Sequence, residues 1–284
     1  MDFARLPEGT FTLANVTVPG HVLGQNEDLV LTDISLADGQ ISDIGGPRVD
    51  MGGAMVFPAF VDMHTHLDKG HIWDRAPNPD GTFAGALNTV AADRAANWSA
   101  EDVRARMEFS LRSAYAHGTR AIRTHLDSIP PQDEISWPVF REAREDWSDR
   151  VALQAVCLVG VNVVDLDGAF IRTADIVAES QGVLGMVTFS IPDFRERLLA
   201  FLRLASERGL SVDFHVDEHG DKGPGTLRAI AEAVLELGFS APVVVGHCCS
   251  LAVQDEGEAE ATLDLVAEAG LHVVSLPMCN LYLQ

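Results

Sequence analysis

Lysine is almost absent from this sequence, and long hydrophobic runs are missing. The 284 residues carry 20 lysines and arginines against 42 acidic residues, a formal net charge of -22, and only Lys69 and Lys222 are lysines. Surfaces that bind nucleic acids or anionic membranes need clustered cations. No apolar stretch approaches the ~20 residues of a membrane span. We therefore expect no nucleic-acid or membrane partner. Formation of a homo-oligomer is compatible with this composition.

Cysteines are few, and they lack the spacing of a disulfide framework. None of Cys157, Cys248, Cys249 and Cys279 belongs to a Cys-x-x-Cys pair, and all four lie in apolar runs. This pattern predicts buried, reduced thiols. The N-terminal stretch MDFARLPEGTF is too polar for a signal peptide. Together these features predict a cytoplasmic protein.

Two regions with different patterns are visible along the chain. Residues 1–54 contain short strand-like runs broken by turns, with a hairpin signal at Asp38-Gly39. They predict the N-terminal part of a small β-sandwich-type domain. Residues 55–284 alternate short β-branched runs with amphipathic stretches, whose helix ends are marked by Gly118, Gly209 and Gly238.

The alternation in the second region predicts an α/β fold with a parallel sheet. Seven strands joined by long connections favour a (β/α)8 TIM-like barrel over an open sheet. No eighth strand follows the seventh, so we expect a barrel that is incomplete at the C-terminus and a natural polypeptide that continues beyond Gln284. The seven predicted strands cover residues 61–66, 119–126, 151–159, 183–189, 210–216, 243–247 and 271–276.

Histidines gather where the predicted strands end, which is where barrel enzymes place their reactive groups. His64 and His66 are two residues apart on one strand, so both side chains point to the same face. His215, on the fifth strand, can supply a third imidazole. A His-x-His pair alone is weak, but its conjunction with His215 and His247 predicts a divalent metal site.

Two further residues at strand ends suit the chemistry of such a site. Glu218 follows His215 by three residues and could shuttle protons from a metal-bound water to a leaving group. His247 ends the sixth strand and could hydrogen-bond the attacking hydroxide. Asp217 is expected to orient a histidine, and the four tryptophans, Trp73 among them, to be packing residues.

The segment Pro58-Ala-Phe-Val-Asp-Met-His64-Thr-His66-Leu-Asp-Lys69, with His215-Val-Asp-Glu218, resembles the amidohydrolase superfamily, and within it the cytosine deaminase-like branch that includes triazine-ring hydrolases. The similarity extends to Arg123-Thr-His-Leu-Asp127 and to the final Asn280-x-x-Leu-Gln284. It implies a single zinc or iron ion held by His64, His66 and His215, Glu218 as proton shuttle, and His247 as the group that orients water and substrate.

The resemblance also identifies candidate substrate-binding residues and two departures from the family. His125 and Asn280 lie in matching motifs. The glutamine with which cytosine deaminases read the pyrimidine edge is missing from the third strand, and Asn162 is its nearest replacement. The family's last metal ligand, an aspartate at the end of strand eight, would lie beyond this chain.

In binuclear members of the superfamily that the chain resembles, a carboxylated lysine at the end of the fourth strand bridges two metals, and the fourth predicted strand here contains no lysine. This favours a single-metal deaminase that removes an amino group from a nitrogen heterocycle, a cytosine-like pyrimidine or a triazine, by metal-hydroxide attack. Two alternatives remain: hydrolysis of a cyclic amide or ureide at the same site, and a metal-free truncated barrel acting as a non-enzymatic partner.

Overall fold

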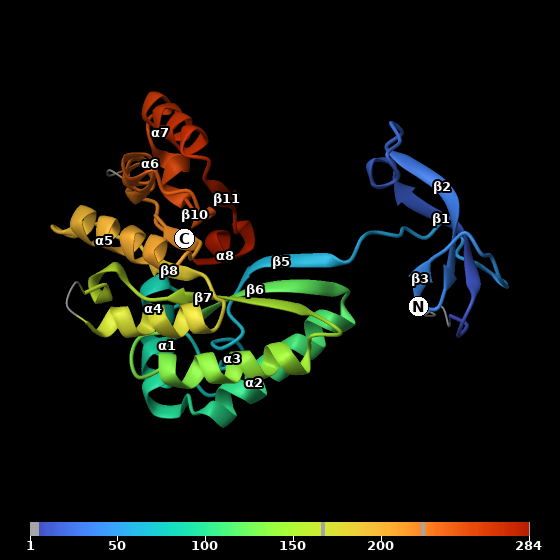
Figure 1. Cartoon of the computed structure of the whole chain (residues 1–284), viewed down its shortest axis with the longest axis horizontal. Coiled ribbons are helices and arrows are strands. Elements are labelled where there is room, and N and C mark those ends of the chain that lie inside the picture. The colour runs from blue at the N-terminus through green and yellow to red at the C-terminus, as the bar shows by residue number, and fades with distance from the viewer. Residues whose placement is uncertain (1–5, 166–167, 223–224, 284) are drawn as a thin grey trace. The chain divides into compact units, whose positions relative to one another are not determined.

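The computed structural model describes residues 6–165, 168–222 and 225–283, and the chain divides into two compact units, one ending at Phe60 and the other beginning at Val61. In the first unit the described strands form one four-stranded sheet in the order β3-β2-β1-β4 (Figure 1). Its strands are β1 (Phe11–Pro19), β2 (Leu29–Ala37), β3 (Gln40–Ile41) and β4 (Arg48–Asp50).

The predicted hairpin is confirmed. Strands β2 and β3 pair antiparallel, and Asp38 and Gly39 connect them with φ angles of 52° and 74°. Positive φ at both central residues gives the turn a twist that matches the flanking strands. A second layer of a sandwich stays a prediction.

The second unit contains seven parallel strands among its described residues, at the positions that the sequence predicted. They are β5 (Phe60–Thr65), β6 (Thr119–Asp127), β7 (Ala152–Leu158), β8 (Leu184–Val187), β9 (Val212–Val216), β10 (Val243–His247) and β11 (His272–Val274). Backbone hydrogen bonds from Cys157 to Val183 and from Val187 to Val159 join β7 to β8. The strands therefore follow one another in sequence order, with their carboxyl ends at one edge. An eighth strand and closure of the sheet stay predictions.

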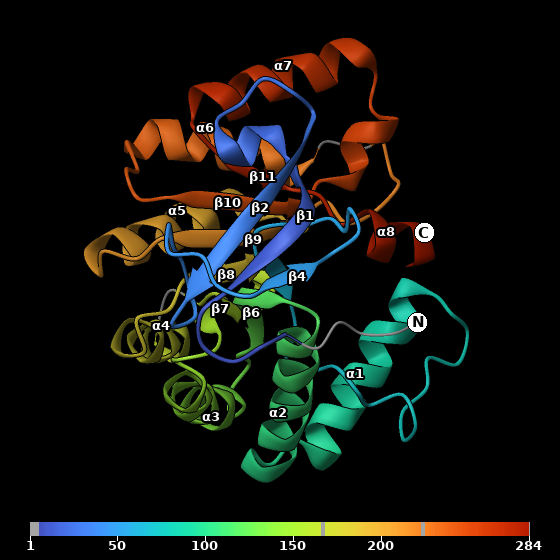
Figure 2. The ribbon, with the colours of Figure 1, turned by 90° about the vertical axis from the view of Figure 1, so that its right-hand side faces the viewer.

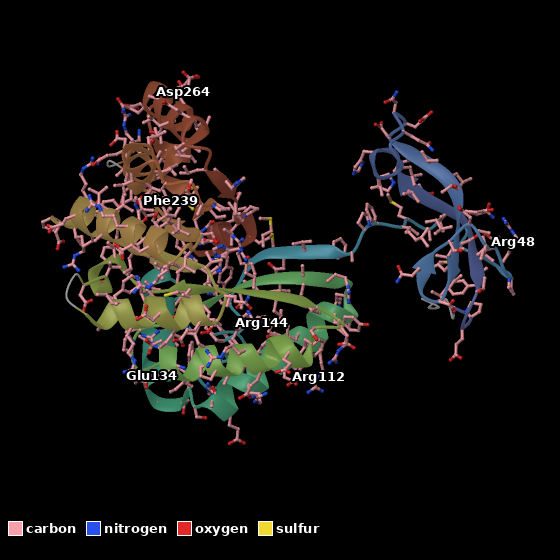
Figure 3. The ribbon with its side chains drawn as sticks, viewed as in Figure 1. Arg48, Arg112, Glu134, Arg144, Phe239 and Asp264 are labelled. Carbon is pink, nitrogen blue, oxygen red and sulfur yellow. The ribbon has the colours of Figure 1, made fainter. Side chains whose placement is uncertain are left out.

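Helices α2 to α7 follow one another around the outer face of this sheet (Figure 2). The helices are α1 (Phe83–Asn97), α2 (Ala100–Ala116), α3 (Asp133–Asp146), α4 (Ala169–Glu179), α5 (Phe194–Glu207), α6 (Thr226–Leu237), α7 (Glu256–Glu268) and α8 (Pro277–Leu283). Their polar faces carry exposed charged residues such as Arg112, Glu134 and Asp264 (Figure 3).

Local signals set the helix ends, as the sequence predicted. The Ser99 hydroxyl accepts a hydrogen bond from the backbone N–H of Asp102 at the start of α2. Gly118, Gly209 and Gly238 follow α2, α5 and α6 with φ between 57° and 89°, a conformation in which glycine avoids the Cβ penalty of other residues.

The core lies between the sheet and the helices, and it contains Trp137, Phe140 and Phe214. Trp98 and Trp147 also pack there, but Trp73 is 60% exposed, so its prediction as a packing residue is wrong. The prediction of buried thiols is likewise wrong for Cys279, which is exposed on α8. No helix among the described residues has both the length and the apolar character needed to cross a bilayer.

Candidate functional site

Three of the predicted ligands converge at the carboxyl ends of β5 and β9. The Nε2 atom of His215 lies 3.1 Å from that of His64 and 3.4 Å from that of His66. The alternation of side chains on β5 places both of its histidines on the same face. The β9 histidine faces them because parallel strands bring their carboxyl ends to one edge.

The three imidazoles fit a divalent ion. Two nitrogens bound at about 2.0–2.1 Å to one tetrahedral ion lie about 3.3 Å apart, close to the observed separations. Burial, with neighbouring histidines, lowers the pKa of His64 to about 2 and holds the pKa values of His66 and His215 well below the ordinary value. The rings are therefore neutral, as metal ligation requires. The Nδ1 atoms of His66 and His215 are buried and have no hydrogen-bond partner in the described part of the chain.

His125 joins this cluster but differs from the other three. Its ligand atom lies within 4.8 Å of theirs, yet Nε2 is 3.2 Å from Asp213 Oδ1 and Nδ1 is 3.4 Å from the carbonyl oxygen of Thr65. Arg123 donates to the other Asp213 oxygen at 3.0 Å. The ring is fully buried, and the role of His125 in substrate binding stays a prediction.

Asp213 was missed from the sequence, although a signal for it exists. It lies two residues before His215 on β9, so the two side chains share a face of the strand. A search for polar residues two positions before or after each strand-end histidine would have found Asp213. It would also have found Asp127, two residues after His125.

Glu218, His247 and Asn280 form a second, connected group. Asn280 Nδ2 donates to Glu218 Oε1 at 3.1 Å, and His247 Nδ1 lies 3.2 Å from the same oxygen. Burial raises the pKa of Glu218 to about 7, against the opposing effects of the Asn280 hydrogen bond and the charge of Lys69. Burial lowers the pKa of His247 to about 4, and its Nε2 atom has no partner among the described residues.

Residues at the ends of β9 and β10 have unusual backbone conformations, which set the directions of the side chains in this group. Asp217, His247 and Cys248 adopt φ angles of 47°, 69° and 53°, which are uncommon for residues other than glycine. Asp217 was expected to orient a histidine, but its carboxylate accepts hydrogen bonds from the backbone N–H groups of Thr226 and Leu227, at 2.8 and 3.1 Å. It therefore caps α6 and fixes the turn that carries Glu218.

Gly246 provides space for the histidine cluster. A Cβ atom at this position would lie 3.1 Å from Cε1 and 3.2 Å from Nδ1 of the His64 ring. Glycine inside a strand commonly marks such a close approach.

Asn162 lies in a short 3-10 helix (Val161–Val163) after β7, at the same edge of the sheet. It is exposed, and no hydrogen bond joins its side chain to the histidines, Glu218 or Asn280 in the described part of the chain. Its role in substrate binding stays a prediction.

An ion-pair network between the loop after β5, α1 and the end of β6 was not predicted from the sequence. Lys69 Nζ lies 2.7 Å from Asp127 Oδ1, and Arg94 donates to Asp127 Oδ2 at 2.5 Å. Asp68 accepts a hydrogen bond from the backbone N–H of Asp127, and burial together with the Asp127 charge raises the pKa of Asp68 to about 7. The network attaches the loop after β5 to the end of β6.

Comparisons with known proteins identify relatives of this chain, although no family model matches it. It is 54% identical to a pterin deaminase of Rhizobium rhizogenes over 96% of this chain and 66% of that protein. It is 22% identical to the N-isopropylammelide isopropyl amidohydrolase of Pseudomonas sp. strain ADP, over 80% of this chain and 58% of that protein. The chain thus spans less than two thirds of the length of each of these curated relatives.

Solved structures show the same fold. A 5-methylcytosine deaminase from Klebsiella pneumoniae superimposes with a TM-score of 0.77 at 20% identity, over 96% of this chain and 67% of that one. A guanine deaminase from C. acetobutylicum superimposes with a TM-score of 0.65 at 13% identity, over 96% of this chain and 69% of that one. The likeness in sequence to the pterin deaminase, together with this fold and the histidine motifs on β5 and β9, shows that the chain belongs to the amidohydrolase superfamily.

Proposed function

We propose that this chain carries the site of a metal-dependent hydrolytic deaminase that acts on a pterin-like heterocycle. The observation that carries the proposal is the convergence of the Nε2 atoms of His64, His66 and His215 at 3.1–3.4 Å, next to the Glu218–His247–Asn280 group. A carboxylate with a raised pKa beside a potential metal site is the arrangement that hydrolysis by general acid–base catalysis requires.

The choice of a pterin-like substrate rests on the 54% identity to a pterin deaminase. A pterin contains an aminopyrimidinone ring whose amino-bearing carbon lies between two nitrogens. The reactive carbon of a pterin is therefore guanidine-like, whereas the amino-bearing carbon of cytosine is amidine-like. A pterin also has a second ring, which a pyrimidine lacks.

His64, His66 and His215 would hold one zinc or iron ion. When bound, such an ion lowers the pKa of a coordinated water toward ~7 and stabilises developing negative charge. The proton transfers and the positioning of the reactants are carried out by side chains of this chain.

Glu218 in its ionised form accepts the proton of the attacking water and passes it to the ring nitrogen beside the reactive carbon. The water oxygen bonds to that carbon. Glu218 then carries the remaining hydroxyl proton to the amino group, the carbon–nitrogen bond breaks, and ammonia leaves as a carbonyl forms. Asn280 fixes the Glu218 carboxylate through its 3.1 Å hydrogen bond. His247, whose buried Nε2 has no partner among the residues that the structure describes, orients the oxygen nucleophile or the substrate.

The proposal is tested with a substrate panel. The chain is stripped of metal and reconstituted with Zn²⁺ or Fe²⁺, and ammonia release is measured from pterin, guanine, cytosine, an amino-triazine and a cyclic ureide. We expect pterin to have the highest kcat/KM and chelation to lower it more than about 100-fold. A ring-opened product from the ureide without ammonia from any amino-heterocycle would favour cyclic amide hydrolysis and contradict the deaminase assignment.

The raised pKa of Glu218 predicts the pH dependence. The ionised carboxylate is lost as the pH falls through about 7, so kcat/KM should decrease about tenfold for each pH unit below that value. Because the Asn280 hydrogen bond lowers this pKa, Asn280→Ala should move the acid limb of the profile to higher pH. Met278→Ala, an exposed change on the same helix, is the control and should leave the limb in place. An acid limb that Asn280→Ala leaves unmoved would mean that another group controls it.

A further inference from the structure

A cavity of about 350 Å³ lies beside the candidate site, within the second unit. Its walls come from the segment after β5, from α1 and from α8, and Figure 2 shows these two helices on the same side of the sheet. The residues that matter here are Lys69, His71, Trp73, Val90, Cys279 and Tyr282. The volume falls in the range of about 300–1,000 Å³ that is typical of small-molecule sites.

The cavity borders the residues that contact Glu218. The Sγ atom of Cys279, on its wall, lies 4.0 Å from Glu218 Oε1, and the next residue, Asn280, donates to the same oxygen. Lys69 also lines the cavity while its Nζ pairs with Asp127. One wall residue of the cavity thus lies within 4.0 Å of the Glu218 carboxylate.

The chemistry of the walls suits a flat aromatic ring. Trp73 and Tyr282 are 60% and 72% exposed, whereas the other three tryptophans are buried. Exposed aromatic rings that line a cavity offer large, rigid surfaces for stacking. The indole N–H of Trp73 and the hydroxyl of Tyr282 also provide polar groups at the ring edges. The Lys69 ammonium on the cavity wall is paired with the Asp127 carboxylate, so it does not need an anionic ligand as a partner.

We propose that this cavity receives the second ring of a bicyclic amino-heterocycle, with Trp73 and Tyr282 as the specificity-determining residues. The inference rests on the proposed function, because it assumes that the reactive ring lies at Glu218. A single-ring aminopyrimidinone would occupy the reactive position and leave the cavity to water. The cavity would thus discriminate a pterin from a pyrimidine by stacking area and exclusion of water.

Two variants and two matched controls test this assignment. Trp73→Ala and Tyr282→Ala remove the aromatic walls at exposed positions. Leu87→Ala on α1 and Met278→Ala on α8 remove exposed apolar side chains that do not line the cavity. For each protein we would measure metal content, kcat/KM for pterin and for isocytosine, which has the reactive ring alone, and the binding of pterin from the quenching of its fluorescence.

We expect Trp73→Ala and Tyr282→Ala each to weaken pterin binding and lower kcat/KM for pterin by about 10- to 100-fold, the size expected for loss of a stacked and buried aromatic contact. Isocytosine turnover should change less than about threefold, and the controls should match the parent. Equal losses for both substrates, or unchanged pterin binding, would overturn the inference. A parent protein that binds pterin in a Trp73-dependent way but releases no ammonia would instead refute the proposed function alone.

Discussion

Glu218→Gln is expected to lower kcat for deamination by about 1,000-fold while the metal content stays unchanged. Glutamine has the same shape as glutamate and can still accept the Asn280 hydrogen bond through its Oε1 atom. It cannot take a proton from water at any accessible pH, so the proton transfer to the ring nitrogen is lost. Steady-state kinetics with pterin and metal analysis of the same preparation measure the two effects.

The pH profile separates a catalytic role of Glu218 from a structural one. The parent should show an acid limb near pH 7, since burial raises the pKa of this carboxyl to about 7, and the variant should lose that limb. Glu232→Gln is the control, because Glu232 lies on α6 and pairs only with Arg228 at the surface among the contacts described. Residual activity above about a tenth of the parent would remove Glu218 from the mechanism.

His66→Ala should remove the bound metal and, with it, the activity. Loss of groups that only support a metal ligand already costs about 10- to 100-fold in affinity, so removing one of three converging imidazoles should cost more than 100-fold. A bound ion stabilises the folded state by mass action. Addition of Zn²⁺ should therefore raise the Tm of the parent but not that of the variant.

The matched control for this ligand is His117→Ala. His117 is exposed at the end of α2, where its Nδ1 atom lies 2.7 Å from the carbonyl oxygen of Ser113. This variant should bind metal like the parent. If His66→Ala keeps a full equivalent of metal and its Tm still rises with Zn²⁺, the assignment of the three histidines as ligands is wrong.

Much of this architecture could be predicted because it is encoded locally. The alternation of β-branched runs with amphipathic stretches located the seven strands seen in the described residues of the second unit, and Gly238 after Leu237 marked the end of α6. The spacing of His64 and His66 placed both rings on one face of β5. These features depend on neighbours within one strand or one helical turn, so the sequence alone determined them.

Only the tertiary structure decided which distant groups pair with one another. The Lys69–Asp127 and His125–Asp213 contacts join residues 58 and 88 positions apart, and they depend on which strands become neighbours. Trp73 lines a cavity together with residues of α1 and α8, which its local sequence does not specify. Asp217 caps α6 only because the turn after β9 returns the helix N-terminus to it.

The two lysines show the same division between what the sequence determines and what the tertiary structure determines. The sequence determined that no lysine lies on the fourth strand of the sheet and that Lys69 follows the histidine pair. The tertiary structure decided that Lys69 pairs with Asp127 and lines the cavity beside Glu218. Composition and spacing are properties of the chain, whereas the partner of a charge depends on which segments folding brings within a few ångströms of it.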